Sequence, residues 1–93
     1  MGLSMCEMEM RRTFGEWLKA VRKRVGLSHL ELSRALGLIN ISTVCNVERG
    51  VNHIPDNHIM SYAAALKIDP EILAKMNMKA FDYTSYRILF EDS

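Results

Sequence analysis

The stretch covering residues 26–50 constrains the fold most, because its caps and glycines divide it into two short helices joined by a tight turn. Ser28 precedes Glu31 by three residues, which is the spacing of a helix-capping box, so the first helix is predicted to begin there. Gly37 is predicted to end that helix, and Gly50 to end the second one. Two helices this short depend on neighbouring elements for their stability.

The second of these helices is predicted to begin around residues 40–42, with Val44 and Val47 facing the core. Its opposite face carries small polar and aliphatic side chains, namely Ile41, Ser42, Thr43 and Asn46. A side chain that reads a base edge in a DNA groove has to be presented in this way. Two structural alternatives stay open: Ser42 and Thr43 could cap the helix, and Ile41 could fold into the core.

Helical patterns flank this stretch on both sides. Thr13 and Glu16 have capping-box spacing, and they start a run of apolar residues at three- and four-residue steps: Phe14, Trp17, Leu18, Val21 and Val25. Leu30 and Ala35 join Leu32 and Leu36 as the expected inward residues of the helix after Ser28. Together with the helices that follow, the pattern predicts an all-α fold of five helices.

A fourth helix is predicted after Pro55, with Asp56 or Asn57 as its cap. Its apolar face is expected to contain Ile59, Met60, Ala63 and Leu66. Asp69 followed by Pro70 predicts the start of a fifth helix, because proline is favoured at the first helical position.

The two ends of the chain lie outside the predicted domain of residues 12–76. Residues 1–11 contain four methionines without a clear period, and we expect a flexible extension. Residues 77–93 contain many aromatic and aliphatic side chains, which should not be left in water. We expect the following of them to form a dimer interface: Phe81, Tyr83, Tyr86, Ile88 and Phe90. Alternation in this tail favours a strand or extended arm, although the spacing also fits a helix, and the tail could instead complete its own core.

Composition gives little guidance about partners, because the net charge is only +1. The basic residues are concentrated in residues 11–24, where six Lys or Arg stand against one Glu. That block could bind phosphate or could form a solvated helix face. Cys6 and Cys45 lack the spacing of a zinc site or a disulfide framework, and no apolar run is long enough to cross a membrane, so a cytoplasmic protein is expected.

No motif for catalysis, metal or cofactor binding is present in the sequence, so we expect neither an enzyme nor a cofactor. The central stretch instead resembles the Cro/C1-type (XRE) helix-turn-helix family over residues 12–76. The resemblance depends on two motifs in register: Leu32-Ser33-x-x-x-Gly37 and Ser42-Thr43-Val44-x-Asn46-Val47-Glu48-Arg49-Gly50. There are four departures. His29 stands where the family usually has Gln, Ser33 stands where it usually has Ala, and both the turn at residues 38–41 and the link after Gly50 are one residue longer than usual.

The resemblance implies a lambda-repressor-like DNA-binding domain, with the recognition helix at about residues 41–49 in the major groove. It further implies a transcriptional repressor or autoregulator that binds an inverted-repeat operator as a homodimer. Two alternatives remain at this stage. One is an antitoxin-type module that binds a toxin partner and autoregulates its operon, and the other is a protein-interaction module without DNA binding.

Site residues follow from the same resemblance, position by position. The expected base contacts are Asn40, Ile41, Ser42 and Asn46, with either Asn40 or Ile41 in the first reading place because of the longer turn. The expected phosphate contacts are Ser28, His29, Thr43, Arg49, Asn52 and His53. Arg22 and Glu48 are expected to form a partly buried ion pair between the first and third helices.

Overall fold

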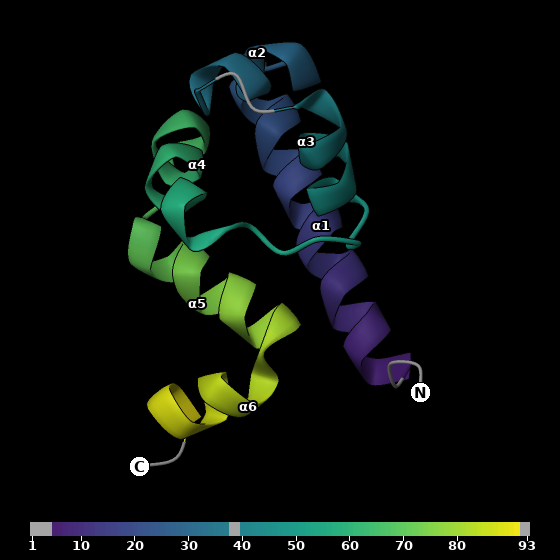
Figure 1. The fold of residues 1–93 in the computed structure, drawn as a ribbon, viewed down its shortest axis with the longest axis vertical. Coiled ribbons are helices and arrows are strands. Elements are labelled where there is room, and N and C mark those ends of the chain that lie inside the picture. Colours follow the sequence, from purple (N-terminus) through teal and green to yellow (C-terminus); the bar gives the residue numbers. More distant parts are fainter. Residues whose placement is uncertain (1–4, 38–39, 92–93) are drawn as a thin grey trace.

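The longest helix, α1 (Met5–Val25), forms one side of the molecule, and shorter helices pack against it (Figure 1). The computed structural model describes residues 5–37 and 40–91. The other elements are α2 (His29–Ala35), α3 (Ile41–Glu48), the 3-10 helix η1 (Asp56–His58), α4 (Ile59–Leu66), α5 (Pro70–Phe81), α6 (Tyr83–Tyr86) and the π-helix η2 (Arg87–Glu91). All regular structure in the described residues is helical, so the all-α prediction is confirmed.

Helix α1 begins earlier than predicted. It starts at Met5 rather than at Thr13, so the predicted cap at Thr13 is wrong, and residues 5–11 are helical instead of a loose extension. Met and Glu are good helix formers, and an acidic residue, Glu7, lies in the first turn, where the helix dipole favours it. Tertiary contacts also hold this part, because Arg11 donates from Nε to the carbonyl of Ala80 at 3.2 Å.

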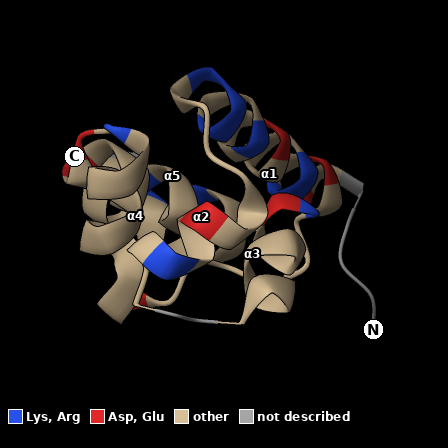
Figure 2. Ribbon diagram, turned by 90° about the horizontal axis from the view of Figure 1, so that it is seen from above, with Lys and Arg blue, Asp and Glu red and all other residues tan. Residues whose placement is uncertain are grey.

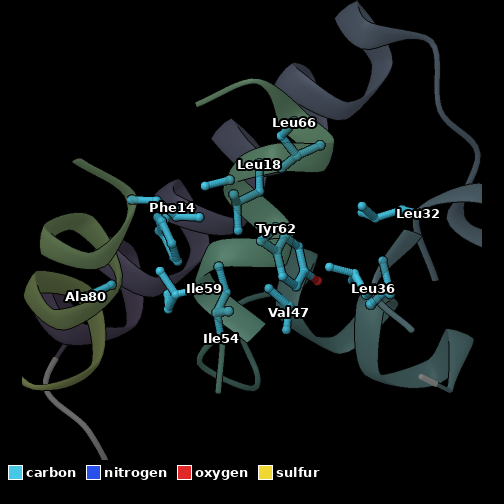
Figure 3. Packing of buried hydrophobic residues seen from close by; sticks show 13 residues of the cluster. Phe14, Leu18, Leu32, Leu36, Val47, Ile54, Ile59, Tyr62, Leu66 and Ala80 are labelled. Atoms are coloured by element: carbon cyan, nitrogen blue, oxygen red, sulfur yellow. The ribbon is translucent and has the colours of Figure 1, made fainter. Parts of the chain in front are cut away.

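The core lies between α1, α2, α3, α4 and α5, with Tyr62 of α4 in its middle (Figure 3). The hydrophobic residues that are buried in it are Phe14, Leu18, Leu32, Leu36, Val44, Val47, Ile54, Ile59, Tyr62, Ala63, Leu66, Leu73 and Ala80. Most of them come from the apolar positions predicted by the helical periodicity. Tyr62 was not among them, although its side chain is only 1% exposed.

Three residues expected to face inward are exposed instead. Leu30 and Ala35 lie on the solvent side of α2, which buries Leu32 and Leu36. Met60 is 67% exposed on α4. Both helices are short and bury only a narrow face, so residues about 100° or more from that face are left in solvent.

A close contact between backbones fixes α3 against α1. At Gly15, in the middle of α1, an added Cβ would lie 2.7 Å from the carbonyl carbon of Glu48 and 3.0 Å from the carbonyl oxygen of Val47. Real Cβ contacts are almost never shorter than 3.0 Å, so only glycine permits this approach. The position of α3 therefore depends on a residue without a side chain in α1.

The link between α3 and α4 is held by a buried side chain. Asn77 of α5 accepts a hydrogen bond from the backbone N–H of Ile54 at 2.9 Å and donates to its carbonyl at 3.0 Å. Ile54 is itself fully buried. The link thus runs across the molecule in a defined path rather than as a loose loop (Figure 1).

The C-terminal segment is helical, so the predicted strand or extended arm is wrong. Asp82 caps α6 by accepting from the Ser85 N–H at 3.3 Å. Helical spacing then brings aromatic rings together: Tyr86 lies 6.1 Å from Tyr83 and 5.5 Å from Phe90, measured between ring centroids. Among the described helices, none is long and apolar enough to cross a membrane.

Candidate nucleic-acid interface

Helix α2 is built by the capping box that the sequence predicted. The Ser28 hydroxyl accepts from the Glu31 N–H at 3.1 Å, and the Glu31 carboxylate accepts from the Ser28 N–H at 2.9 Å. The hydrogen bond from the Ser28 backbone and the one from its side chain lower the pKa of Glu31. Ser28 is exposed at the start of the helix. Gly37, with φ +90°, follows the end of the helix.

Helix α3 is capped by Asn40, whose side-chain oxygen accepts from the Ser42 N–H at 2.8 Å. Ser42 and Thr43 are therefore not the caps of this helix, which was the structural alternative for them. The carbonyl oxygen of Asn40 is engaged at the cap, so only its amide nitrogen remains for a base. The longer turn precedes this cap, and its residues 38–39 lie outside the described part of the chain.

The outer face of α3 carries the side chains expected to read bases. Ile41 is 41% exposed, so the alternative that it belongs to the core is wrong. Ser42 is exposed, while Thr43 and Asn46 are half-buried. Val44 and Val47, on the opposite face, are fully buried, as predicted. The structure thus brings Ile41, Ser42 and Asn46 onto one accessible face of a helix that is fixed from behind.

A buried ion pair connects α1 to α3. Arg22 Nε lies 2.6 Å from Glu48 Oε2, and Arg22 Nη2 lies 3.2 Å from Glu48 Oε1. Both side chains are less than a tenth exposed, so the pair is buried more completely than the resemblance implied. Arg22 also donates from Nη1 to the carbonyl of Leu27, which fixes the turn before α2. Removal of one partner would leave an uncompensated buried charge, at a cost of about 3–5 kcal/mol.

His29 joins this pair, which the sequence did not predict. Its Nε2 lies 3.0 Å from Glu48 Oε1, the oxygen that Arg22 Nη2 also contacts. The imidazole is 38% exposed, so it is accessible from solvent while bonded to a buried group.

The remaining expected phosphate contacts lie in and after the last turn of α3. Arg49, Asn52 and His53 are exposed. The backbone carbonyl of Asn46 accepts from the N–H groups of Val51 and Asn52, at 2.9 and 3.3 Å, so this loop is attached to α3 itself. His53 is turned away from α3 toward α5, because its Nδ1 lies 3.0 Å from the carbonyl of Ile54 and its ring lies 5.9 Å from that of Phe81.

Charge is unevenly spread over this surface. Figure 2 shows Lys and Arg concentrated on α1, whereas α3 carries no blue segment. Arg22, which belongs to the basic block, forms the buried ion pair with Glu48 and does not face solvent. Arg34, which sequence reasoning missed, is exposed in the last turn of α2. The sequence contains a signal for Arg34 as a phosphate contact, because it is the only Lys or Arg between Arg24 and Arg49.

The geometry described above is that of two short helices, one capped by Ser28 and one presenting small side chains, joined by a turn. A family model described as helix-turn-helix matches residues 18–73, which is more than half of the chain. The chain belongs to the Cro/C1-type helix-turn-helix family. The Cro/C1-type family consists of DNA-binding transcription regulators rather than enzymes, and the match supports this coarse assignment. No curated protein matches the chain. Within the described residues, no three His, Cys, Asp or Glu side chains are grouped so as to hold a metal ion.

Proposed function

We propose that the protein is a transcriptional repressor or autoregulator that binds an inverted-repeat operator as a homodimer in the cytoplasm. The observation that carries the proposal is the outer face of α3, which presents small polar side chains and Ile41 while Val44 and Val47 of the inner face are fully buried. In this arrangement α3 enters the major groove and α2 lies across the DNA backbone.

Base contacts are assigned to α3. Asn46 can form two hydrogen bonds with adenine, and Ile41 can pack on a thymine methyl group. Ser42 can bond to any base with a suitable group in the groove. Asn40 retains a smaller role through its amide nitrogen, because its oxygen caps the helix.

Phosphate contacts are assigned to the edges of the helix pair. Ser28, His29 and Thr43 are candidates on one side, and Arg49, Asn52 and His53 on the other. We add Arg34, since it is an exposed cation on α2. His53 has the weakest claim, because its ring lies against Phe81.

Titration of duplex DNA at several salt concentrations tests the DNA-binding proposal. A dimer that uses Arg34 and Arg49 of each protomer neutralises about four phosphates, so the slope of log affinity against log salt should be about −3 to −4. Arg34→Gln should reduce the slope by about two for the dimer, whereas Lys67→Gln, at the exposed residue after α4, should leave it unchanged. Absence of binding at low salt would reject the proposal in favour of a protein-interaction module.

Dimerisation is assigned to the C-terminal segment, for which Phe81, Tyr83, Tyr86, Ile88 and Phe90 were expected to act. Three consecutive apolar side chains of η2 are exposed: Ile88 by 62%, Leu89 by 63% and Phe90 by 45%. A monomer rarely leaves such a surface in water, and a second copy of the same segment would cover it.

Sedimentation of the wild type and of the double variant Ile88→Asp/Leu89→Asp tests this assignment. The wild type should be a dimer and the variant a monomer with weaker binding to an inverted repeat, because pairing two half-sites multiplies affinity. Met60→Asp, at an exposed apolar position on α4, is the control. A double variant that stays dimeric would place the interface elsewhere and would favour a different partner, such as a toxin, for the tail.

A further inference from the structure

His29 forms a hydrogen bond whose direction can be deduced from its neighbours. Its Nε2 lies 3.0 Å from Glu48 Oε1, and Arg22 donates to both oxygens of the same carboxylate, at 2.6 and 3.2 Å. A carboxylate paired with a guanidinium in this way is ionised and can only accept hydrogen bonds. His29 Nε2 must therefore carry a hydrogen and donate it to Glu48.

This assignment determines what the other ring nitrogen can do. A neutral imidazole has one N–H, so with the hydrogen on Nε2 the Nδ1 of His29 is a bare acceptor. A bare acceptor repels a phosphate oxygen. With 38% of its side chain exposed, the ring is open to solvent and to a ligand on the surface that we assign to the DNA backbone.

We infer that DNA binding is coupled to uptake of one proton by His29 of each bound protomer. The proton comes from the buffer and adds to Nδ1, so that the imidazolium donates Nε2–H to Glu48 and Nδ1–H to a phosphate oxygen. When DNA dissociates, the proton returns to the buffer. This inference rests on the proposed function, and it concerns a position where the family usually has Gln, which has no proton to gain.

The charges around His29 explain why the proton should arrive with the DNA. Glu48 of α3 is already paired with Arg22 of α1, and Arg22 Nη2 shares the same oxygen as His29, so a second cation here gains little from Glu48 alone. On α2 itself the exposed Glu31 and Arg34 are of opposite sign. Two further titratable groups lie near Glu48: Cys45 on the same helix and Tyr62 on α4. Neither adds a positive charge.

A phosphate would supply the missing negative charge. The described part of α3 from Ile41 to Val47 carries no Lys or Arg, so one additional cation is a large change for this surface. Charge-assisted hydrogen bonds are about twice as strong as neutral ones, which favours the protonated ring in the complex. DNA and proton therefore bind to His29 with mutual reinforcement, as linkage requires.

The pH dependence of DNA affinity tests the inference. We would measure binding to one operator duplex, obtained by selection from random DNA, over the range around 6.5 in which histidine titrates and at constant ionic strength. Wild-type affinity should rise as pH falls, by about tenfold per protomer between pH 8 and pH 6, since uptake of one proton gives at most tenfold per pH unit. His29→Gln still donates an N–H to Glu48, so it should bind at every pH without this rise. His58→Gln, at the histidine that ends η1 and that we assign to no DNA contact, is the matched control and should keep the wild-type profile.

A second measurement does not depend on DNA. The ¹⁵N chemical shifts of the free protein at pH 8 should show His29 with its hydrogen on Nε2, and a hydrogen on Nδ1 would overturn the inference. A flat wild-type profile, or a His29→Gln variant with the wild-type profile, would overturn it while leaving DNA binding intact. Loss of binding by all three proteins at low salt would instead reject the proposed function together with the inference.

Discussion

Tyr62 brings a hydroxyl group into the apolar centre of the core, between residues of α2, α3 and α4 (Figure 3). Among the described residues it has the only buried side-chain polar atom without a hydrogen-bond partner. Burial, with smaller contributions from Glu48 and Cys45, raises the pKa of Tyr62 above its usual value. The folded state therefore holds this proton more tightly than the unfolded state does. The corresponding stability is complete below pH 10 and is lost as pH rises above that value.

Replacing Tyr62 with Phe should remove this alkaline sensitivity. At pH 7 we expect the free energy of unfolding to be unchanged or to rise by about 1 kcal/mol, because an unpaired hydroxyl leaves the core. Above pH 10, wild-type stability should fall by up to about 1.4 kcal/mol per pH unit, and Tyr62→Phe should fall less steeply. Urea unfolding at pH 7 and above pH 10 measures the free energy of unfolding of both proteins. Tyr83→Phe, at a 40% exposed position, is the control. A loss of more than about 1 kcal/mol in Tyr62→Phe at pH 7 would mean that the hydroxyl is bonded.

At the scale of residues, the sequence predicts what local chemistry decides. The caps at Ser28 and Asp69 are confirmed because each requires only partners within three residues. The hydrogen bonds of Asn77 and His29 were not predicted from the sequence, since their partners lie 23 and 19 residues away. No local pattern specifies that Asn77 binds the backbone of a distant loop or that His29 contacts Glu48.

At the scale of elements, the close approach of α1 and α3 at Gly15 makes one strong prediction. In an isolated helix, Gly→Ala is stabilising by about 1 kcal/mol, because glycine costs backbone entropy. Here the new Cβ would collide with the backbone of Glu48, and α3 has little room to move because its inner face is packed in the core. We expect Gly15→Ala to be destabilising by about 1–3 kcal/mol, as overpacking usually is.

Thermal unfolding of Gly15→Ala measures the effect, and Lys19→Ala, at an exposed position one turn later in α1, serves as the control. The control should melt within a few degrees of the wild type. A Gly15→Ala variant that melts higher than the wild type would show that α1 and α3 are farther apart than described. DNA affinity should fall with stability, since the same contact holds the recognition helix.

The two wrong predictions about elements, the start of α1 and the form of the C-terminal tail, have a common cause. The early start of α1 and the helical form of the tail both depend on contacts between the ends of the chain and α5. Arg11 lies 4.7 Å from the ring centroid of Phe81, and Lys75 Nζ lies 4.9 Å from that of Phe90. Such contacts form only after the chain has folded, so a weakly periodic segment takes its conformation from them rather than from its own pattern.

At the scale of the whole molecule, the scaffold of the site was predictable and its surface chemistry was not. The buried Val44 and Val47 place α3 correctly, and the family match supports its role. The basic block of residues 11–24 is less available than its composition suggested, because Arg22 is buried against Glu48. With few cations beside α3, the proposed affinity for DNA depends on base contacts, on pairing of two protomers and on the proton that we infer at His29.

The contribution of Asn46 to sequence discrimination tests the central claim most directly. We would compare wild type, Asn46→Ala and the exposed control Met60→Ala for binding to the selected operator and to a scrambled duplex at one salt concentration. We expect Asn46→Ala to lose about 10- to 100-fold in operator affinity for each half-site, corresponding to about 1–3 kcal/mol for a good base contact, with no change on scrambled DNA or in melting temperature. Met60→Ala should match the wild type on both duplexes. Wild-type affinity that is equal for operator and scrambled DNA, or an Asn46→Ala variant that binds the operator as the wild type does, would contradict a base-reading α3.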